Sequence, residues 1–78
     1  MKTTAYFEAV RKRPDRAVIL EDWIERAMSS PIREQIQADG RIRRWIRIPE
    51  AGGRFLRVVL LPDGETVHNA FFDRGFVP

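Results

Sequence analysis

The fold is decided by residues 41–61, which read RIRRWIRIPEAGGRFLRVVLL. Polar and apolar residues alternate along most of the first eight positions, which predicts a β-strand with two chemically different faces. Residues 49–53 contain a proline and two glycines and predict a loop, and the mainly apolar run 54–61 predicts a second, central strand. A five-residue loop places Ile48 opposite Arg54 in an antiparallel pair.

Two further strands extend this pair into a meander. A weakly alternating strand at residues 32–36 precedes Ala38-Asp39-Gly40, a hairpin loop in which the glycine supplies the left-handed conformation. Pro62-Asp63-Gly64 is a strong turn signal, and a last strand follows from about Glu65 to Phe72. We expect the tail, residues 73–78, to fold back, because its phenylalanine needs cover.

In the first thirty residues, the apolar residues recur at helical spacing instead. A short helix is expected from about Tyr6 to Val10, capped by Thr3 or Thr4 and ended by Pro14. A second helix is predicted by apolar residues at helical spacing, namely Leu20, Trp23, Ile24, Ala27 and Met28. The sequence therefore predicts a single α+β domain over residues 1–78, with two N-terminal helices packed on one face of a four-stranded antiparallel β-meander.

The composition limits the chemistry that the chain can perform. It has no cysteine and one histidine, so disulfides, thiolate sites and His-rich metal sites are excluded, and we expect neither a metal nor a cofactor. The N-terminus does not resemble a signal peptide, and no apolar stretch approaches the ~20 residues needed to span a bilayer. We therefore expect a cytoplasmic protein without a membrane partner.

The basic residues are 12 arginines and 2 lysines, and the net charge is +3. Arginine binds phosphate through two hydrogen bonds and stacks on flat rings, which suits nucleic acid. A GC-rich genome, which favours arginine codons, explains the same bias without any function. A second basic group, Arg11-Lys12-Arg13 with Arg16, suits the end of a helix or extends a nucleic-acid surface.

The strand at 41–48 places its arginines on one side of the sheet. Its even positions are mainly isoleucine and would meet the helices, and the exception, Arg44, is explained by an ion pair with Glu34 across the first hairpin. The opposite side would bind RNA through phosphate contacts and through stacking on the indole. The residues predicted to do so are Arg41, Arg43, Trp45, Arg47 and, from the next strand, Arg57. A solvated charged face is the simpler explanation.

The side on which His68 lies depends on the register of the last hairpin. A two- or four-residue turn pairs Val59 with His68, which buries Val67 and Phe71 and puts the histidine near Arg43. A three-residue loop moves it to the covered side. The burial of apolar side chains favours the first register. The glycine at the third position of a Pro62-Asp63-Gly64 loop favours the second.

A histidine beside arginines suits cleavage of a phosphodiester by the RNA's own 2′-hydroxyl. Arg43 and Arg57 would stabilise the charged transition state, and His68 would act as acid or base. The catalytic candidates are therefore His68, Arg43 and Arg57.

Four features of the chain follow one another in a known order: the turn at Arg13–Arg16, the helix from Val18, the closing Ser30-Pro31 and the meander from Arg54. In this order they resemble the RelE/ParE-type toxin superfamily, and within it small domains related to the BrnT-like toxins. The resemblance implies two helices on one face of an antiparallel sheet, endoribonuclease activity often directed at messenger RNA on the ribosome, and inhibition by an antitoxin protein. The chain lacks a strand ahead of its helices and has no lysine on the basic face, so no catalytic residue is assigned by correspondence.

Three functions are compatible with these features. The first is a small basic domain that acts on nucleic acid, with a toxin-like endoribonuclease as its specific form. The second is a non-catalytic domain whose exposed aromatic residues contact a protein partner. The third is a domain that binds a phosphorylated ligand.

Overall fold

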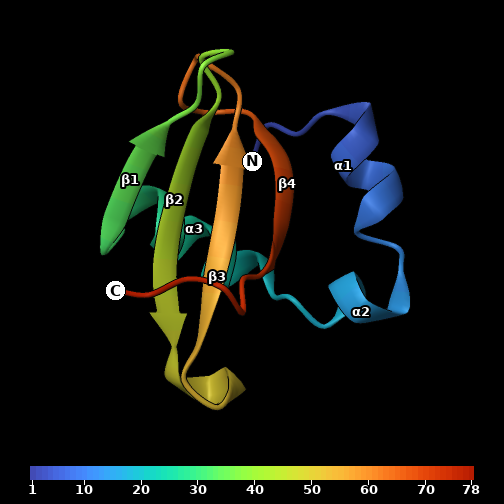
Figure 1. The fold of residues 1–78 in the computed structure, drawn as a ribbon. Helices are drawn as coiled ribbons and strands as arrows, with labels where there is room; N and C mark the ends of the chain where they lie inside the picture. The colour runs from blue at the N-terminus through green and yellow to red at the C-terminus, as the bar shows by residue number, and fades with distance from the viewer.

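The computed structural model describes residues 1–78 and has an α+β fold built on one four-stranded sheet (Figure 1). The strands are β1 (Arg33–Ile36), β2 (Ile42–Ile48), β3 (Arg54–Leu60) and β4 (Val67–Phe72). They lie in the order β1-β2-β3-β4 and every neighbouring pair is antiparallel, which confirms the predicted meander.

Three helices precede the sheet, where the sequence predicted two. They are α1 (Ala5–Val10), α2 (Pro14–Ala17) and α3 (Glu21–Ser29). Thr4 caps α1 by accepting a 3.1 Å hydrogen bond from the backbone N–H of Phe7. Pro14 begins the unpredicted helix α2, because the first helical position needs no N–H donor and favours the φ of proline.

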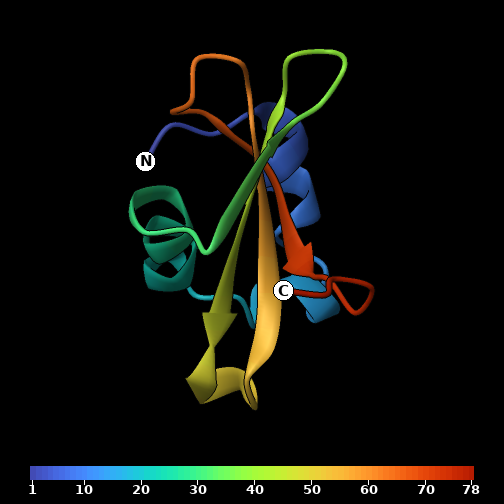
Figure 2. The same cartoon turned by 60° about the vertical axis from the view of Figure 1, so that its left-hand side comes forward.

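The hydrophobic core lies between the helices and the sheet. Helix α3 crosses the back of β2 and β3, and α1 lies alongside β4 (Figures 1 and 2). The apolar stripe of α3 buries Trp23, Ile24 and Ala27, whereas Leu20 stays 53% exposed ahead of the helix. The fully buried strand residues are Ile48, Leu56, Val58, Leu60 and Val67. None of the helices has both the length and the apolarity needed to cross a bilayer.

The register of the first three strands is the predicted one. Ile48 pairs with Arg54 and Trp45 pairs with Arg57, because the five-residue loop fixes the alignment. Arg44 pairs with Glu34 and donates to its carboxylate at 2.8 Å, so the predicted ion pair is present. Arg44 also donates to the carbonyl of Met28 at 2.9 Å and so satisfies an acceptor in the last turn of α3.

The last hairpin begins in the first predicted register and leaves it at a β-bulge, so Val67 is buried as predicted but Phe71 is not. Leu61 and Thr66 close a four-residue loop, which the Asp63 carboxylate holds by accepting from Thr66 and the loop backbone; these hydrogen bonds lower the pKa of Asp63 to about 2. Val67 then pairs with Leu60, but Asn69 rather than His68 pairs with Val59. His68 is therefore the extra residue of the bulge, which lets residues on both sides of it bury their side chains.

The two edges of the sheet differ. The edge of β4 is covered at Val67, whose backbone bonds to the N-terminal segment through Lys2 and Thr4. It is covered again at Ala70, whose carbonyl accepts from Arg16 at 3.3 Å. All four residues of β1, at the other edge, are exposed.

Candidate nucleic-acid interface

The side of the sheet that faces away from α3, here called the front face, carries most of the predicted site. It faces the viewer in Figure 1, and the C-terminal tail crosses it. Alternation along the paired strands sends to this face Arg33 and Gln35 of β1, Arg43, Trp45 and Arg47 of β2, Phe55, Arg57 and Val59 of β3, and Asn69 and Phe71 of β4. Arg41 precedes β2 in the same alternation.

Charge is segregated on this face. Residues 21–78 contain nine arginines and nine acidic residues, so this part of the chain has no net charge. Five of those arginines lie on the front face, at positions 33, 41, 43, 47 and 57, whereas the strands contribute no carboxylate to it. Asp73, at the start of the tail, is the acidic side chain that reaches it, and Asp39 pairs with Arg41 at its margin.

Arg43 and Arg57 lie near the centre of the face and have different partners. Arg43 donates to the neutral side chain of Gln35 at 3.3 Å. Arg57 pairs with Asp73 at 3.3 Å and lies against the ring of Phe71, 4.9 Å from its centroid. The Nε atoms of both arginines are buried and have no hydrogen-bond partner, so each guanidinium has a spare donor.

Trp45 does not offer a free ring face. It is only 5% exposed, because Phe76 of the tail stacks on it at 4.9 Å with 19° between the planes. Phe55 flanks Phe76 on one side and Arg33 lies over its ring at 5.1 Å. The predicted return of the tail is thus confirmed, and it closes the stacking platform proposed for Trp45.

Asp73 fixes the start of this tail. Oδ2 of its carboxylate accepts from the indole N–H of Trp45 at 3.0 Å and from Arg57. Oδ1 accepts from the backbone N–H of Gly75 at 3.1 Å. The hydrogen bond from Trp45 lowers the pKa of Asp73, and those from Gly75 and Arg57 act in the same direction, against the effect of burial.

His68 lies at the end of the front face near Arg41. Its Nδ1 is 3.1 Å from the hydroxyl of Thr4, and its ring stacks on Tyr6 at 4.9 Å. Burial lowers the pKa of His68 and the charge of Arg41 adds to this, while Asp39 opposes it. The imidazole is therefore mainly neutral at pH 7, and Thr4 sets its orientation.

Two open hollows lie on the front face. One, of about 490 Å³, is lined by Tyr6, Gln37, Arg41, Arg57, Val59, His68, Asn69 and Phe71. The other, of about 520 Å³, lies beside the tail and includes Arg33, Trp45, Arg57 and Asp73. The structure thus brings Arg41, Arg57 and His68 together around the first hollow. Arg43 is paired with Val59, which is paired in turn with Asn69, so these three residues lie side by side across the strands. Arg47 lies apart from both hollows, against Gly53.

Four residues of this site escaped the sequence analysis, and one of them, Arg33 of β1, was not assigned to either face there. Thr4 was assigned only as a helix cap, Tyr6 only as the start of a helix, and Asp73 only as part of the tail. The sequence Asp73-Arg74-Gly75 signals a turn, but nothing local to it indicates the contact with Trp45. No group of three or more potential metal ligands is present.

Comparison with known proteins gives no relative from which a function can be taken. No protein-family model, curated protein or solved structure matches the chain. The resemblance to the RelE/ParE-type superfamily therefore stays a prediction.

Proposed function

We propose that the front face binds single-stranded RNA. The observation that carries this proposal is the collection of five arginines, in or next to three neighbouring strands, on one side of the sheet, within a part of the chain, residues 21–78, that has no net charge. Arginine donors matched to phosphate supply the electrostatic part of such binding, and exposed rings supply the stacking part.

Phosphate contacts are assigned first to Arg43 and Arg41. Arg43 is bonded to a neutral amide and keeps its full charge for an anion, whereas Arg57 is already paired with Asp73. Arg41 has a longer ion pair, 3.7 Å to Asp39, its side chain is 43% exposed, and it lines the 490 Å³ hollow together with Tyr6. Arg47 extends the basic surface toward the loop after β2.

The stacking platform is assigned to Tyr6 rather than to Trp45. Tyr6 is 52% exposed and already stacks on His68, so a base placed on its outer face would continue an existing stack. Base–aromatic stacking contributes ~1–3 kcal/mol per base.

Cleavage of the bound RNA is the specific form of this function. The Thr4 hydroxyl accepts from the Phe7 N–H and has a second lone pair, so it can also accept from Nδ1–H of His68. Nε2 of the neutral imidazole is then free to take the proton of an RNA 2′-hydroxyl. The 2′-oxygen bonds to phosphorus, the P–O5′ bond breaks, and the imidazolium returns its proton to the departing 5′-oxygen. The products are a 2′,3′-cyclic phosphate and a 5′-hydroxyl, and Arg41 and Arg57 would stabilise the charge that develops on the phosphoryl oxygens.

Binding is tested with a fluorescently labelled, unstructured RNA at increasing salt. We expect log K to fall with log salt by ~0.7 for each phosphate contacted, and Arg43→Ala to weaken binding about tenfold and reduce that slope by about one contact. Arg26→Ala is the matched control, because it removes the same charge from α3 on the other side of the sheet. Absence of binding at low salt would refute the proposal and leave the protein-interaction function as the better candidate.

Cleavage is tested separately from binding. The full chain should convert the RNA to products that end in a cyclic phosphate and leave DNA of the same sequence intact, since DNA lacks the attacking hydroxyl. His68→Gln should abolish cleavage while RNA affinity is retained. Equal cleavage by the variant would exclude His68 as the base. An antitoxin partner and a ribosomal target are further predictions of the superfamily resemblance.

A further inference from the structure

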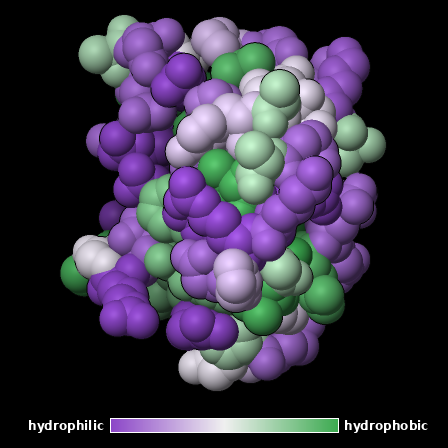
Figure 3. All heavy atoms as spheres, turned by 90° about the vertical axis from the view of Figure 1, so that its right-hand side faces the viewer, coloured by the Kyte–Doolittle hydropathy of each residue, from purple (hydrophilic) through white to green (hydrophobic).

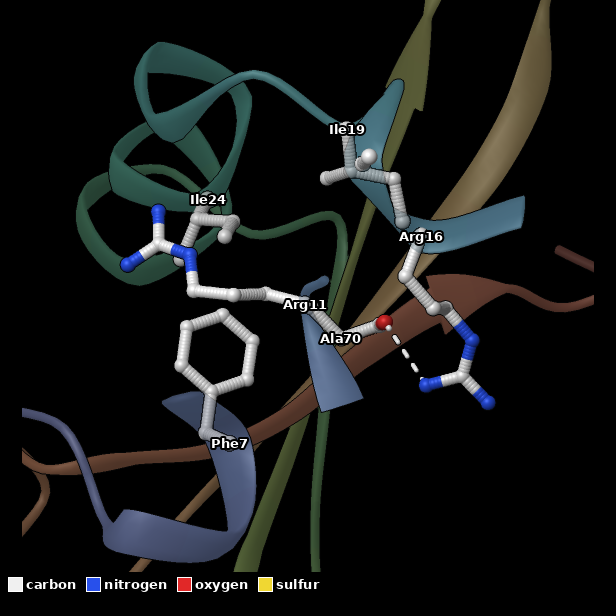
Figure 4. Close-up of a pocket in the computed structure, with 7 residues that line it drawn as sticks. Phe7, Arg11, Arg16, Ile19, Ile24 and Ala70 are labelled. Carbon is white, nitrogen blue, oxygen red and sulfur yellow. Dashed lines mark hydrogen bonds between the residues drawn. The ribbon is translucent and has the colours of Figure 1, made fainter. Parts of the chain in front are cut away.

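A small apolar pocket lies on the side of the molecule formed by α1, α2 and the edge of β4. Its volume is about 120 Å³, and Phe7, Ile19 and Ile24 form most of its wall, with Ala17 and Ala70 (Figure 4). Figure 4 shows Arg11 extending along Phe7 toward Ile24, while the guanidinium of Arg16 turns away to the carbonyl of Ala70. The pocket is thus lined by five apolar residues and two arginines.

The size of the pocket suits one side chain. Sites for small molecules usually measure ~300–1,000 Å³, whereas an engineered cavity of ~150 Å³ takes up a single benzene. A leucine or phenylalanine side chain from another polypeptide matches this scale. Anchor residues of this kind, inserted into a preformed pocket, dominate the affinity of many protein interfaces.

Two exposed apolar residues are adjacent in the chain to a residue that lines the pocket. Val18 and Leu20, which flank the lining residue Ile19 in the chain, are 56% and 53% exposed. Figure 3 shows this side of the molecule, where hydrophobic residues interrupt the hydrophilic surface. A partner would therefore bury apolar surface around the anchor as well as inside the pocket.

The charge around the pocket defines the partner further. The segment that surrounds the pocket, residues 8–21, carries four basic and three acidic side chains. Arg16 pairs with Asp15 at 3.5 Å. Lys12 and Arg13 form no ion pair, and Arg11 shares its charge with Glu8 at 3.2 Å and Glu21 at 3.8 Å. Carboxylates on the partner would complement this surface.

We propose that this pocket is a docking site for a protein partner that inserts one bulky apolar side chain flanked by acidic residues. The site lies away from the front face and does not depend on RNA binding.

The test uses the isotope-labelled full chain and three synthetic peptides, Glu-Glu-X-Glu-Glu with X as Phe, Leu or Ala. Backbone amide shifts in NMR titrations give the affinity and locate the contact. We expect the Phe and Leu peptides to bind at least about tenfold more tightly than the Ala peptide, with shifts centred on Ala17, Ile19 and Ala70. Lys12→Gln should weaken all three peptides by a similar factor, and Arg43→Ala should change none of them.

Ala17→Leu fills the pocket and is expected to abolish the preference for Phe and Leu. The comparison of peptides on the unaltered chain does not need this variant to fold. Equal binding of the three peptides would overturn the proposal. Shifts centred on the front face would also overturn it, because they would identify general attraction of acidic peptides to the arginines there.

Discussion

Replacing Asp73 by alanine tests what holds the C-terminal tail on the front face. The carboxylate accepts from the indole N–H of Trp45 at 3.0 Å and from Arg57 at 3.3 Å, and its side chain is 17% exposed. Alanine leaves both donors without a partner in a half-buried setting. Phe76, which follows in the same tail, would lose its fixed position over Trp45.

The expected loss follows from these contacts. A hydrogen bond to a charged group contributes ~1.5–3 kcal/mol, and an abandoned buried donor costs ~1–3 kcal/mol. Because these two figures describe overlapping parts of one loss and the carboxylate is partly exposed, we expect a loss of about 2–3 kcal/mol. For a chain this small, with an m-value near ~1 kcal/mol per molar urea, the midpoint of unfolding should fall by about 2–3 M. Asp73→Asn keeps an acceptor without the charge and should lose roughly half as much.

Urea titration followed by tryptophan fluorescence measures this change. A Trp23→Phe background leaves Trp45 as the sole reporter of the tail. Asp22→Ala is the control, because its carboxylate is 67% exposed and its ion pair with Arg26 is a surface contact. A loss of about 0.5 kcal/mol or less for Asp73→Ala, the range of ordinary surface changes, would refute the reasoning.

The pH dependence of stability provides a second measure of the same contact. The pKa of Asp73 is lowered in the folded chain, so the unfolded chain takes up the proton first as the pH falls. The contribution of Asp73 is fully present above the unfolded pKa of about 3.9 and is lost as the pH falls through the folded pKa. Asp73→Ala should lack this part of the acid destabilisation.

Three further changes test the parts that surround the site. Thr4→Ala is expected to cost about 1 kcal/mol in thermal unfolding by removing the cap of α1, and Thr4→Ser should restore most of it. Gly53→Ala is expected to cost roughly 1–2 kcal/mol in the same assay, because φ is +76° and a Cβ would lie 2.6 Å from the Arg47 side chain. Gly52→Ala is its control: φ is +73° but no atom lies within 4 Å, so this variant measures the backbone strain without the clash. Stability should fall as the pH drops below the ordinary His68 pKa of 6.5, since the folded pKa is lowered and the unfolded chain is protonated first; His68→Gln should remove this slope in urea titrations between about pH 7 and pH 5.

The register of β1, β2 and β3 was predictable because it depends on short-range features. The five-residue loop and the isoleucines of β2 both require Ile48 opposite Arg54, and a slip by one residue would expose the whole apolar set. The ion pair of Arg44 with Glu34 followed from the same alignment. The alternation of polar and apolar residues and the length of the loop were sufficient to predict this register, because no bulge interrupts these strands.

The register of β4 was predictable only at its start: the four-residue loop sets the first predicted register, and a bulge then changes it. Asp63 closes a four-residue loop, which buries Val67, and the bulge at His68 then shifts the alternation so that Ala70 is also buried. A bulge adds one residue to one strand, and no sequence period reveals it in advance. The position of His68 beside Tyr6 and Thr4 depends on that extra residue.

Alternation along a strand determines the side of the sheet on which a residue lies, but it does not determine whether that residue is accessible. All four predicted arginines lie on the predicted side, with Arg33 beside them, and their long side chains can reach past whatever covers the backbone. Trp45 is on the same side, yet six residues at the end of the chain return and cover its ring. An exposed aromatic beside this face is therefore found where the tail does not pass, at Tyr6 of the N-terminal helix. The charge pattern of β2 and β3 was sufficient to locate the surface, whereas its stacking group came from a segment more than thirty residues away in the chain.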